Sequence, residues 1–354
     1  MKYYWDKRIL RKMAKNPITL GEAKELIKVA RDPFSMEDNL KFRKAESFTY
    51  DLRYLKGKIY CYPFLAELMD NTEGLRNTTF EFLNTKNTYS LDTSVELTKD
   101  FFSTVNDPDI QKAFNHAFSK LEGRFRRIHH IFNAYYKAHT YFLEGTKDFL
   151  MDISPSNRLD DTLKIDHEFG HVIGYYLRNF KCTDANFEIF DEIESTFLEL
   201  IAMDFLEKTS DFKEDVLAER IYFYKQLVEE ADIMLSKFDI FYATENILAH
   251  SELEDFTLRK LYIYMTRVLD VPRKDINDAL KVPAEYSLQY IISQLIALEL
   301  YDISLQDPNE AYRLYKIIIS LKGNTDEEIM NKIKELGISP ASHITTFTRK
   351  LTRN

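Results

Sequence analysis

The sequence predicts a mainly α-helical domain with a small β-hairpin beside one central helix. Apolar residues recur at helical three-to-four spacing along most of the chain. The 354 residues include only 9 Gly and 9 Pro, which favours long helices. One pair of short β-type segments is separated by a turn. No linker or internal repeat divides the chain. We therefore expect one domain over residues 1–354, with an N-terminal helical part at 1–139 and a second part at 140–354.

Before residue 140 the patterns predict several helices and one short strand. A short helix and a loop are expected in residues 1–18, after which Thr19 and Glu22 form a capping box that begins the next helix. The strand is expected at 56–62. The helices are expected at 19–31, 37–55, 92–102 and 110–132, the last from an apolar pattern running from Ile110 to Phe132.

The hairpin is expected from strands at 140–143 and 148–153, and a Ser-Pro-Ser-Asn segment ends it. The second strand, 148–153, is expected to offer an edge to an extended peptide. All later elements are expected to be helices. They lie at 159–177, 187–206, 211–238, 241–250, 256–270, 284–304, 308–321, 325–336 and 341–352.

Composition limits the classes of function. A net charge of −9 argues against general nucleic-acid binding, and we interpret the basic run Arg124–Arg127 as a solvated helix face. No 18-residue apolar stretch predicts a membrane span, and the first residues do not resemble a signal peptide. Cys61 and Cys182 form neither a disulfide framework nor a paired-cysteine metal site. These features predict a cytoplasmic protein.

The helix at 159–177 carries a His-Glu-x-x-His motif, formed by His167, Glu168 and His171. Helical geometry places the two imidazoles one turn apart on one face with the carboxylate beside them, which suits zinc binding. Gly170 and Gly174 leave a strip without side chains, where a neighbouring helix or a substrate backbone can approach closely. The alternative is an amphipathic helix whose histidines are merely solvated.

A catalytic zinc usually takes three protein ligands, so a further carboxylate is needed. Glu192, Ser195 and Glu199 share one face of the helix at 187–206, whereas Glu194 is expected to point away from it. Glu192 is therefore the expected third ligand. Glu199 is expected to accept a hydrogen bond from a histidine, with Ser195 nearby. The alternative is an acidic, solvated helix end.

The segment at 140–206 resembles the thimet oligopeptidase and oligoendopeptidase F metallopeptidases, most closely the latter. Asp148-Phe149-Leu150-Met151-Asp152 is similar to the strand before the family's motif. Glu192-Ile193-Glu194-Ser195 is similar to its Glu-x-x-Ser motif, which carries the third zinc ligand. The resemblance implies a zincin-like fold and oligopeptide substrates held in a deep cleft. Members are longer, which implies that this chain lacks much of the roof over the cleft, leaving it wider or covered by a second copy in a homo-oligomer.

The family also carries a histidine and a tyrosine-rich segment that contact substrate and stabilise the oxyanion. The best counterpart here contains Tyr286 and Tyr290 but no histidine just upstream. The resemblance thus implies a metallopeptidase of the gluzincin type, with one zinc on His167, His171 and Glu192, in which residues 140–354 form the catalytic part. Glu168 would be the general base and Tyr286 or Tyr290 an oxyanion donor. The alternatives are a zinc-binding scaffold without activity and a protease that cleaves intact proteins.

Overall fold

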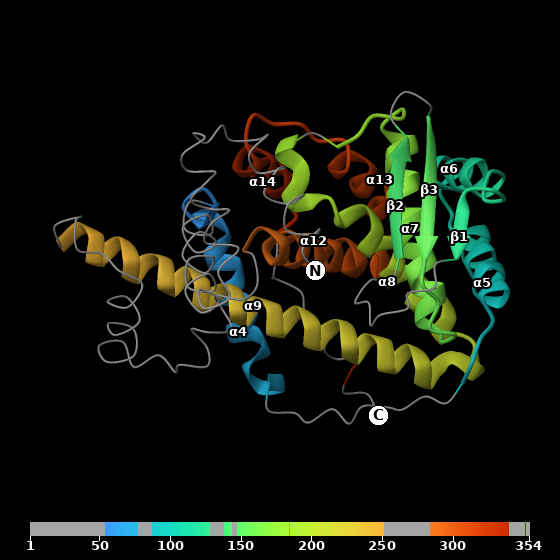
Figure 1. Ribbon diagram of the computed structural model, residues 1–354, viewed down its shortest axis with the longest axis horizontal. Helices are drawn as coiled ribbons and strands as arrows, with labels where there is room; N and C mark the ends of the chain where they lie inside the picture. The colour runs from blue at the N-terminus through green and yellow to red at the C-terminus, as the bar shows by residue number, and fades with distance from the viewer. Residues whose placement is uncertain are drawn as a thin grey trace, which may run out of the picture.

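The computed structural model describes residues 54–76, 87–127, 138–143, 147–183, 185–250, 284–339 and 351. Within these ranges the chain is mainly helical with one small sheet, which confirms the predicted fold class (Figure 1). The helices expected within 1–18 and at 19–31, 37–55, 256–270 and 341–352 lie wholly or almost wholly outside the described residues. The single-domain organisation stays a prediction.

Several of the described helices begin and end close to the bounds that periodicity predicts. Polar N-caps begin several of them: Ser90 accepts from the Thr93 amide at 3.1 Å, and Asp107 from the Ile110 amide at 3.0 Å. The α-helices are α4 Tyr62–Arg76, α5 Leu91–Thr104, α6 Pro108–Phe118, α7 Asp160–Leu177, α8 Ile193–Glu207, α9 Lys213–His250, α12 Ala284–Gln306, α13 Pro308–Ile318 and α14 Asp326–Glu335. Among these, α5, α7, α12, α13 and α14 are close to the predicted bounds. Short 3₁₀ turns lie at η2 Ile59–Cys61, η3 Ala185–Phe190 and η4 Ser210–Phe212.

In the described part of the chain three strands form one sheet in the order β1-β3-β2. The expected hairpin is confirmed: β2 (Ala138–Leu143) pairs antiparallel with β3 (Asp148–Ile153), and Leu143 lies opposite Asp148. β1 (Phe125–Arg127) pairs parallel with the other side of β3. β1 covers only Met151–Ile153 on that side, so the expectation that 148–153 offers a peptide-binding edge is wrong for this half of β3. β2 is the edge strand of the described sheet on the hairpin side.

The expectation of a single long helix at 110–132 is wrong for residues 119–127, and residues 128–132 lie outside the described part of the chain. α6 ends at Phe118, and Gly123 then adopts a φ of +80°, a left-handed conformation that turns the chain into β1. The basic run consequently lies on β1 and the residue before it, and Arg124 and Arg126 pair with Asp148 and Asp152 of β3. Helical spacing cannot anticipate this pairing, because the partner strand lies more than twenty residues further along the chain.

Two further expectations are corrected. The strand expected at 56–62 is replaced by η2 and the start of α4, whose first turn holds Pro63, a residue well suited to a helix start. The helices expected at 211–238 and 241–250 are one continuous helix, α9. Asp239, where we expected a break, is a poor helix former but carries no steric obstacle to continuing the helix.

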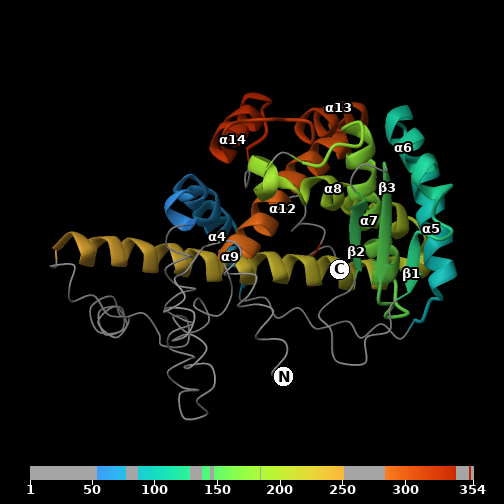
Figure 2. The same ribbon diagram turned by 45° about the horizontal axis from the view of Figure 1, so that its top comes forward.

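Helix α7 lies at the centre of the part that holds the motif. It packs against β2, α5, α6 and α8, and Ile165, Phe169 and Ile173 on its inner side are fully buried. Figures 1 and 2 show the sheet with α5 and α6 at the end of the molecule where α9 begins, while α12 lies on the side of α8 away from the sheet. Among the described helices none is long and apolar enough to cross a membrane. The motif is thus carried by a helix held on several sides.

Candidate metal centre

The start of α7 is fixed by a carboxylate. Asp161, which is fully buried, accepts hydrogen bonds from the backbone amides of Ser156 at 2.9 Å and Asn157 at 2.7 Å. Lys164 donates to the same side chain at 3.2 Å. These bonds join the loop after β3 to the first turn of α7, so the histidine face of the helix has a defined orientation relative to the sheet.

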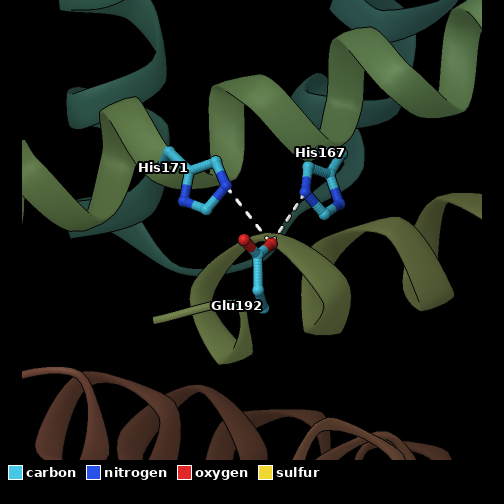
Figure 3. Close-up of side chains that lie close together, drawn as sticks. All are labelled: His167, His171 and Glu192. Atoms are coloured by element: carbon cyan, nitrogen blue, oxygen red, sulfur yellow. Dashed lines mark hydrogen bonds and ion pairs between the residues drawn. The ribbon is translucent and has the colours of Figure 1, made fainter. Parts of the chain in front are cut away.

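The structure brings His167, His171 and Glu192 together (Figure 3). Their ligand atoms all lie within 4.8 Å of one another. Oε2 of Glu192 lies 3.1 Å from Nε2 of His167 and 3.5 Å from Nε2 of His171. Two imidazole nitrogens and one carboxylate oxygen are the donor set of many catalytic zinc sites, so the residues present fit a zinc ion.

Glu192 reaches this position from the N-cap of α8 rather than from inside a helix. The helix expected at 187–206 is interrupted at this point, between η3 and α8. The Ser195 hydroxyl, one turn into α8, donates to Oε2 of Glu192 at 3.2 Å and to its backbone oxygen at 3.1 Å. Ser195 therefore helps to fix the rotamer of the carboxylate.

Gly170 and Gly174 allow α8 to approach α7. A Cβ atom at Gly170 would lie 2.5 Å from the Cα of Ser195 and 2.8 Å from the backbone oxygen of Glu194. A Cβ atom at Gly174 would overlap the Glu194 carboxylate. The glycine strip was expected to admit either a neighbouring helix or a substrate backbone, and the structure shows a neighbouring helix, α8. This close contact brings Glu192 near the histidines.

The second ring nitrogen of each histidine meets a carboxylate from α8. Nδ1 of His167 lies 2.9 Å from Oε2 of Glu199, which is the contact expected from the helical face. Nδ1 of His171 lies 3.2 Å from Oε1 of Glu194. When Nδ1–H donates a hydrogen bond to the carboxylate, the proton of the neutral ring stays on Nδ1 and the Nε2 lone pair is free to face a metal ion.

Glu194 is not among the candidate metal-binding residues, as expected from its helical face, but it lies closer to the centre than expected because it contacts Nδ1 of His171. Its side chain is 2% exposed and forms an ion pair with Arg178, the C-cap of α7. Glu192 approaches Nε2 of His171 and Glu194 approaches Nδ1, so the two carboxylates contact different edges of the same ring. A helical projection of one segment cannot show this, because it omits the crossing helix.

The charges of the cluster depend strongly on one another. Burial lowers the pKa of His167, but hydrogen bonds with Glu192 and Glu199 outweigh this effect and raise the pKa to about 10. Burial likewise acts against the charged form of His171, yet Glu192 and Glu194 hold its pKa well above the usual range. Burial would raise the pKa of Glu192, but the positive histidines hold it well below the usual range. The carboxylates thus favour positive charge where the Nε2 atoms converge, as a cation site requires.

Glu168 lies beside this cluster on α7. The residue is 5% exposed, and its Oε2 is buried without a hydrogen-bond partner among the described residues. Burying a carboxylate oxygen without a hydrogen-bond partner costs free energy. A polar reacting group bound beside Glu168 would supply such a partner, which is a physical reason for the arrangement. The Thr140 hydroxyl of β2 donates to the Glu168 backbone oxygen at 3.4 Å, which places the edge strand next to this residue.

The structure gives less information about Tyr286 and Tyr290, the expected oxyanion donors. Both tyrosines belong to α12, which packs against α8. Tyr290 is half-buried, and the side chain of Tyr286 lies outside the described residues. A cavity of about 270 Å³ lies next to this part of α12, between Gln289, Asn186 and Asp326. Its lining residues do not include the histidine cluster, so the metal centre is defined by side-chain geometry and not by this cavity.

Comparison with known proteins supports the fold. No family model matches the chain, and no curated protein matches its sequence. A solved structure described as an oligoendopeptidase F is similar with a TM-score of 0.52 and 13% identity, covering 88% of this chain and 58% of that one. A second, described as an oligoendopeptidase F from Bacillus anthracis, has a TM-score of 0.50 and 14% identity, covering 92% and 56%. The chain has the fold of oligoendopeptidase F, over a little more than half the length of the structures it matches.

Proposed function

We propose that this chain is a zinc-dependent metalloendopeptidase that hydrolyses peptide bonds in oligopeptides. The observation that carries the proposal is the convergence of His167, His171 and Glu192 together with the nearby Glu168. Against the effect of burial, the charge of Glu168 helps to raise the pKa of His171, and its Oε2 is buried without a hydrogen-bond partner among the described residues. A purely structural zinc site takes its fourth ligand from the protein and has no use for such a carboxylate. This arrangement therefore supports an enzyme over a zinc-binding scaffold.

Three atoms would hold one zinc ion per chain: Nε2 of His167, Nε2 of His171 and a carboxylate oxygen of Glu192. Zinc bound there would supply a Lewis acid that polarises a peptide carbonyl and lowers the pKa of water to about 7. Glu199 and Glu194 would keep the histidines in the tautomer that presents Nε2, and Ser195 would hold the Glu192 carboxylate in place.

Glu168 would be the general base. Its carboxylate would accept the proton of the attacking water and then donate it to the nitrogen of the leaving amine. Its position next to His167 in sequence keeps it on the ligand-bearing side of α7. Low exposure reduces competition from bulk water for the carboxylate oxygen.

The substrate would bind as an added strand on β2. β2 is an edge of the described sheet, so its backbone groups on that side can pair with an extended peptide. Thr140 bonds β2 to the carbonyl of Glu168, so a peptide on this edge would pass close to the general base. Tyr286, with Tyr290 as the second choice, would donate a hydrogen bond to the developing oxyanion. A cytoplasmic location and a second copy of the chain over the cleft stay predictions.

A cleavage assay with two substrate classes tests the proposal. The purified chain is incubated with a mixed oligopeptide library and with folded proteins, each with and without chelator, and products are identified by mass spectrometry. Chelator-sensitive cleavage of peptides alone is the expected result. Chelator-sensitive cleavage of the folded proteins would indicate a protease for intact proteins. Zinc binding without any cleavage would indicate a scaffold.

A further inference from the structure

We propose that Arg178 is a positioning residue of the metal centre, because it holds the Glu194 carboxylate that orients His171. The inference rests on the metal-binding half of the proposed function. Arg178 does not contact the metal-binding atoms itself. It acts through Glu194, whose Oε1 lies 3.2 Å from Nδ1 of His171.

The contacts form a chain from the end of α7 back to its histidine. The Nη1 group of Arg178 donates to Oε2 of Glu194, and Nη2 donates to Oε1 at 3.3 Å. Two N–H groups on two oxygens fix both the place and the plane of a carboxylate. Oε1 is also the acceptor for His171, so the angle of the imidazole depends on the same plane.

The guanidinium is itself held from two other sides. Its Nε donates to the Lys181 backbone oxygen at 3.3 Å, and its Nη1 approaches the Ile319 backbone oxygen at 3.5 Å. The Tyr315 hydroxyl donates to the backbone oxygen of Glu194 at 3.2 Å. The ion pair is therefore fixed to the loop after α7 and to α13, and neither partner can turn without breaking bonds to other elements.

The two histidines differ in this support. Glu199, the partner of His167, has a side chain that is 20% exposed and can be hydrated. The Glu194 side chain is 2% exposed, and the Arg178 side chain is 9% exposed. A buried carboxylate that loses its cation is strongly disfavoured in its old position. Removing Arg178 should thus displace Glu194 and release His171, while His167 keeps its partner.

The test measures the zinc Kd of the full chain by competition with a chromogenic chelator. Arg178→Met removes the charge at similar volume and should raise the Kd by about 10–100-fold, the usual effect of losing a residue that orients a metal ligand. Arg178→Lys should recover part of this loss, because an ammonium group can pair with the carboxylate but cannot bind both oxygens as a planar fork.

The matched control is Arg220→Met. Arg220 is also a buried arginine, 1% exposed, and pairs with Asp204 and with Glu207 at 3.1 Å, away from the histidines. Both Met variants should lower thermal stability, but Arg220→Met should change the zinc Kd by no more than about twofold, as expected of a distant site. An equal loss of zinc affinity in the control would show a general structural effect and overturn the proposal.

An unchanged Kd in Arg178→Met would also overturn it. If that variant does not fold, Glu194→Gln breaks the same link at constant volume, and an unchanged Kd there has the same meaning. Peptide cleavage by the parent chain is recorded alongside. A parent that binds zinc without cleaving peptides would refute the proposed catalysis and leave the role of Arg178 standing, whereas a parent that binds no zinc would refute both.

Discussion

Replacing Gly170 by alanine tests whether the close contact between α7 and α8 builds the metal centre. The added Cβ would lie 2.5 Å from the Cα of Ser195 and 2.8 Å from the backbone oxygen of Glu194. Both are backbone positions and cannot move aside as a flexible side chain can. Normal contact requires about 3.4 Å or more, so the helices must separate by about 1 Å at this point.

Two opposing effects set the change in stability. Alanine in a helix interior is favoured over glycine by about 1 kcal/mol. Overpacking in a well-packed interior typically costs about 1–3 kcal/mol, and here the obstacle is rigid backbone. We therefore expect Gly170→Ala to lower the free energy of unfolding by about 1–2 kcal/mol in spite of its better helix propensity.

The effect on zinc should be larger than the effect on stability. Ser195 is three residues from Glu192, so a shift of about 1 Å in α8 carries the carboxylate with it, and metal–ligand distances tolerate only about 0.2 Å. We expect the zinc Kd to rise by at least about tenfold. Urea unfolding of the metal-free protein and chelator competition measure the two quantities.

Gly57→Ala is the control, because its Cβ would meet only the Tyr54 backbone oxygen at an ordinary 3.5 Å. This variant should leave both the unfolding free energy and the zinc Kd near the parental values. A Gly170→Ala protein that is as stable as the parent and binds zinc equally well would refute the argument that the glycine sets the helix spacing.

Three further predictions concern single side chains of the centre. His167→Ala should leave far less than one equivalent of zinc after purification without added metal, and full zinc retention in metal analysis would exclude the site. Glu199→Gln should raise the zinc Kd by about tenfold, because the amide is a weaker acceptor for the histidine N–H; an unchanged Kd would show that the 2.9 Å contact does not support His167. Tyr286→Phe should lower kcat by about 100-fold with little change in KM, as loss of a transition-state donor does. An unchanged kcat in both Tyr286→Phe and Tyr290→Phe would place the donor elsewhere.

Local sequence signals account for the central part of the fold. The motif helix and the hairpin follow from periodicity and turn residues within the segments themselves, and the structure places both where these signals predict. β1 could not be predicted in this way, because its apolar residues continue the spacing of α6. Its strand conformation depends on pairing with β3, which is a contact between distant segments.

The same distinction applies to the candidate site. The spacing within α7 was enough to select His167 and His171, and the face of the helix expected at 187–206 was enough to select Glu192 and Glu199, although Glu192 is the N-cap of α8. Glu194 and its partner Arg178 were missed, because their contacts depend on how α7 and α8 cross. The glycine strip was the available signal, since it indicated a close approach without identifying the approaching residue.

The most direct test of the central claim compares peptide hydrolysis by the parent chain and by Glu168→Gln, each loaded with one equivalent of zinc. The amide keeps the size of the side chain but cannot accept the proton of the attacking water. The account predicts that the variant retains the fold and the zinc of the parent and loses nearly all peptide turnover. Hydrolysis by Glu168→Gln at close to the parental rate, or no hydrolysis by the zinc-loaded parent, would contradict it.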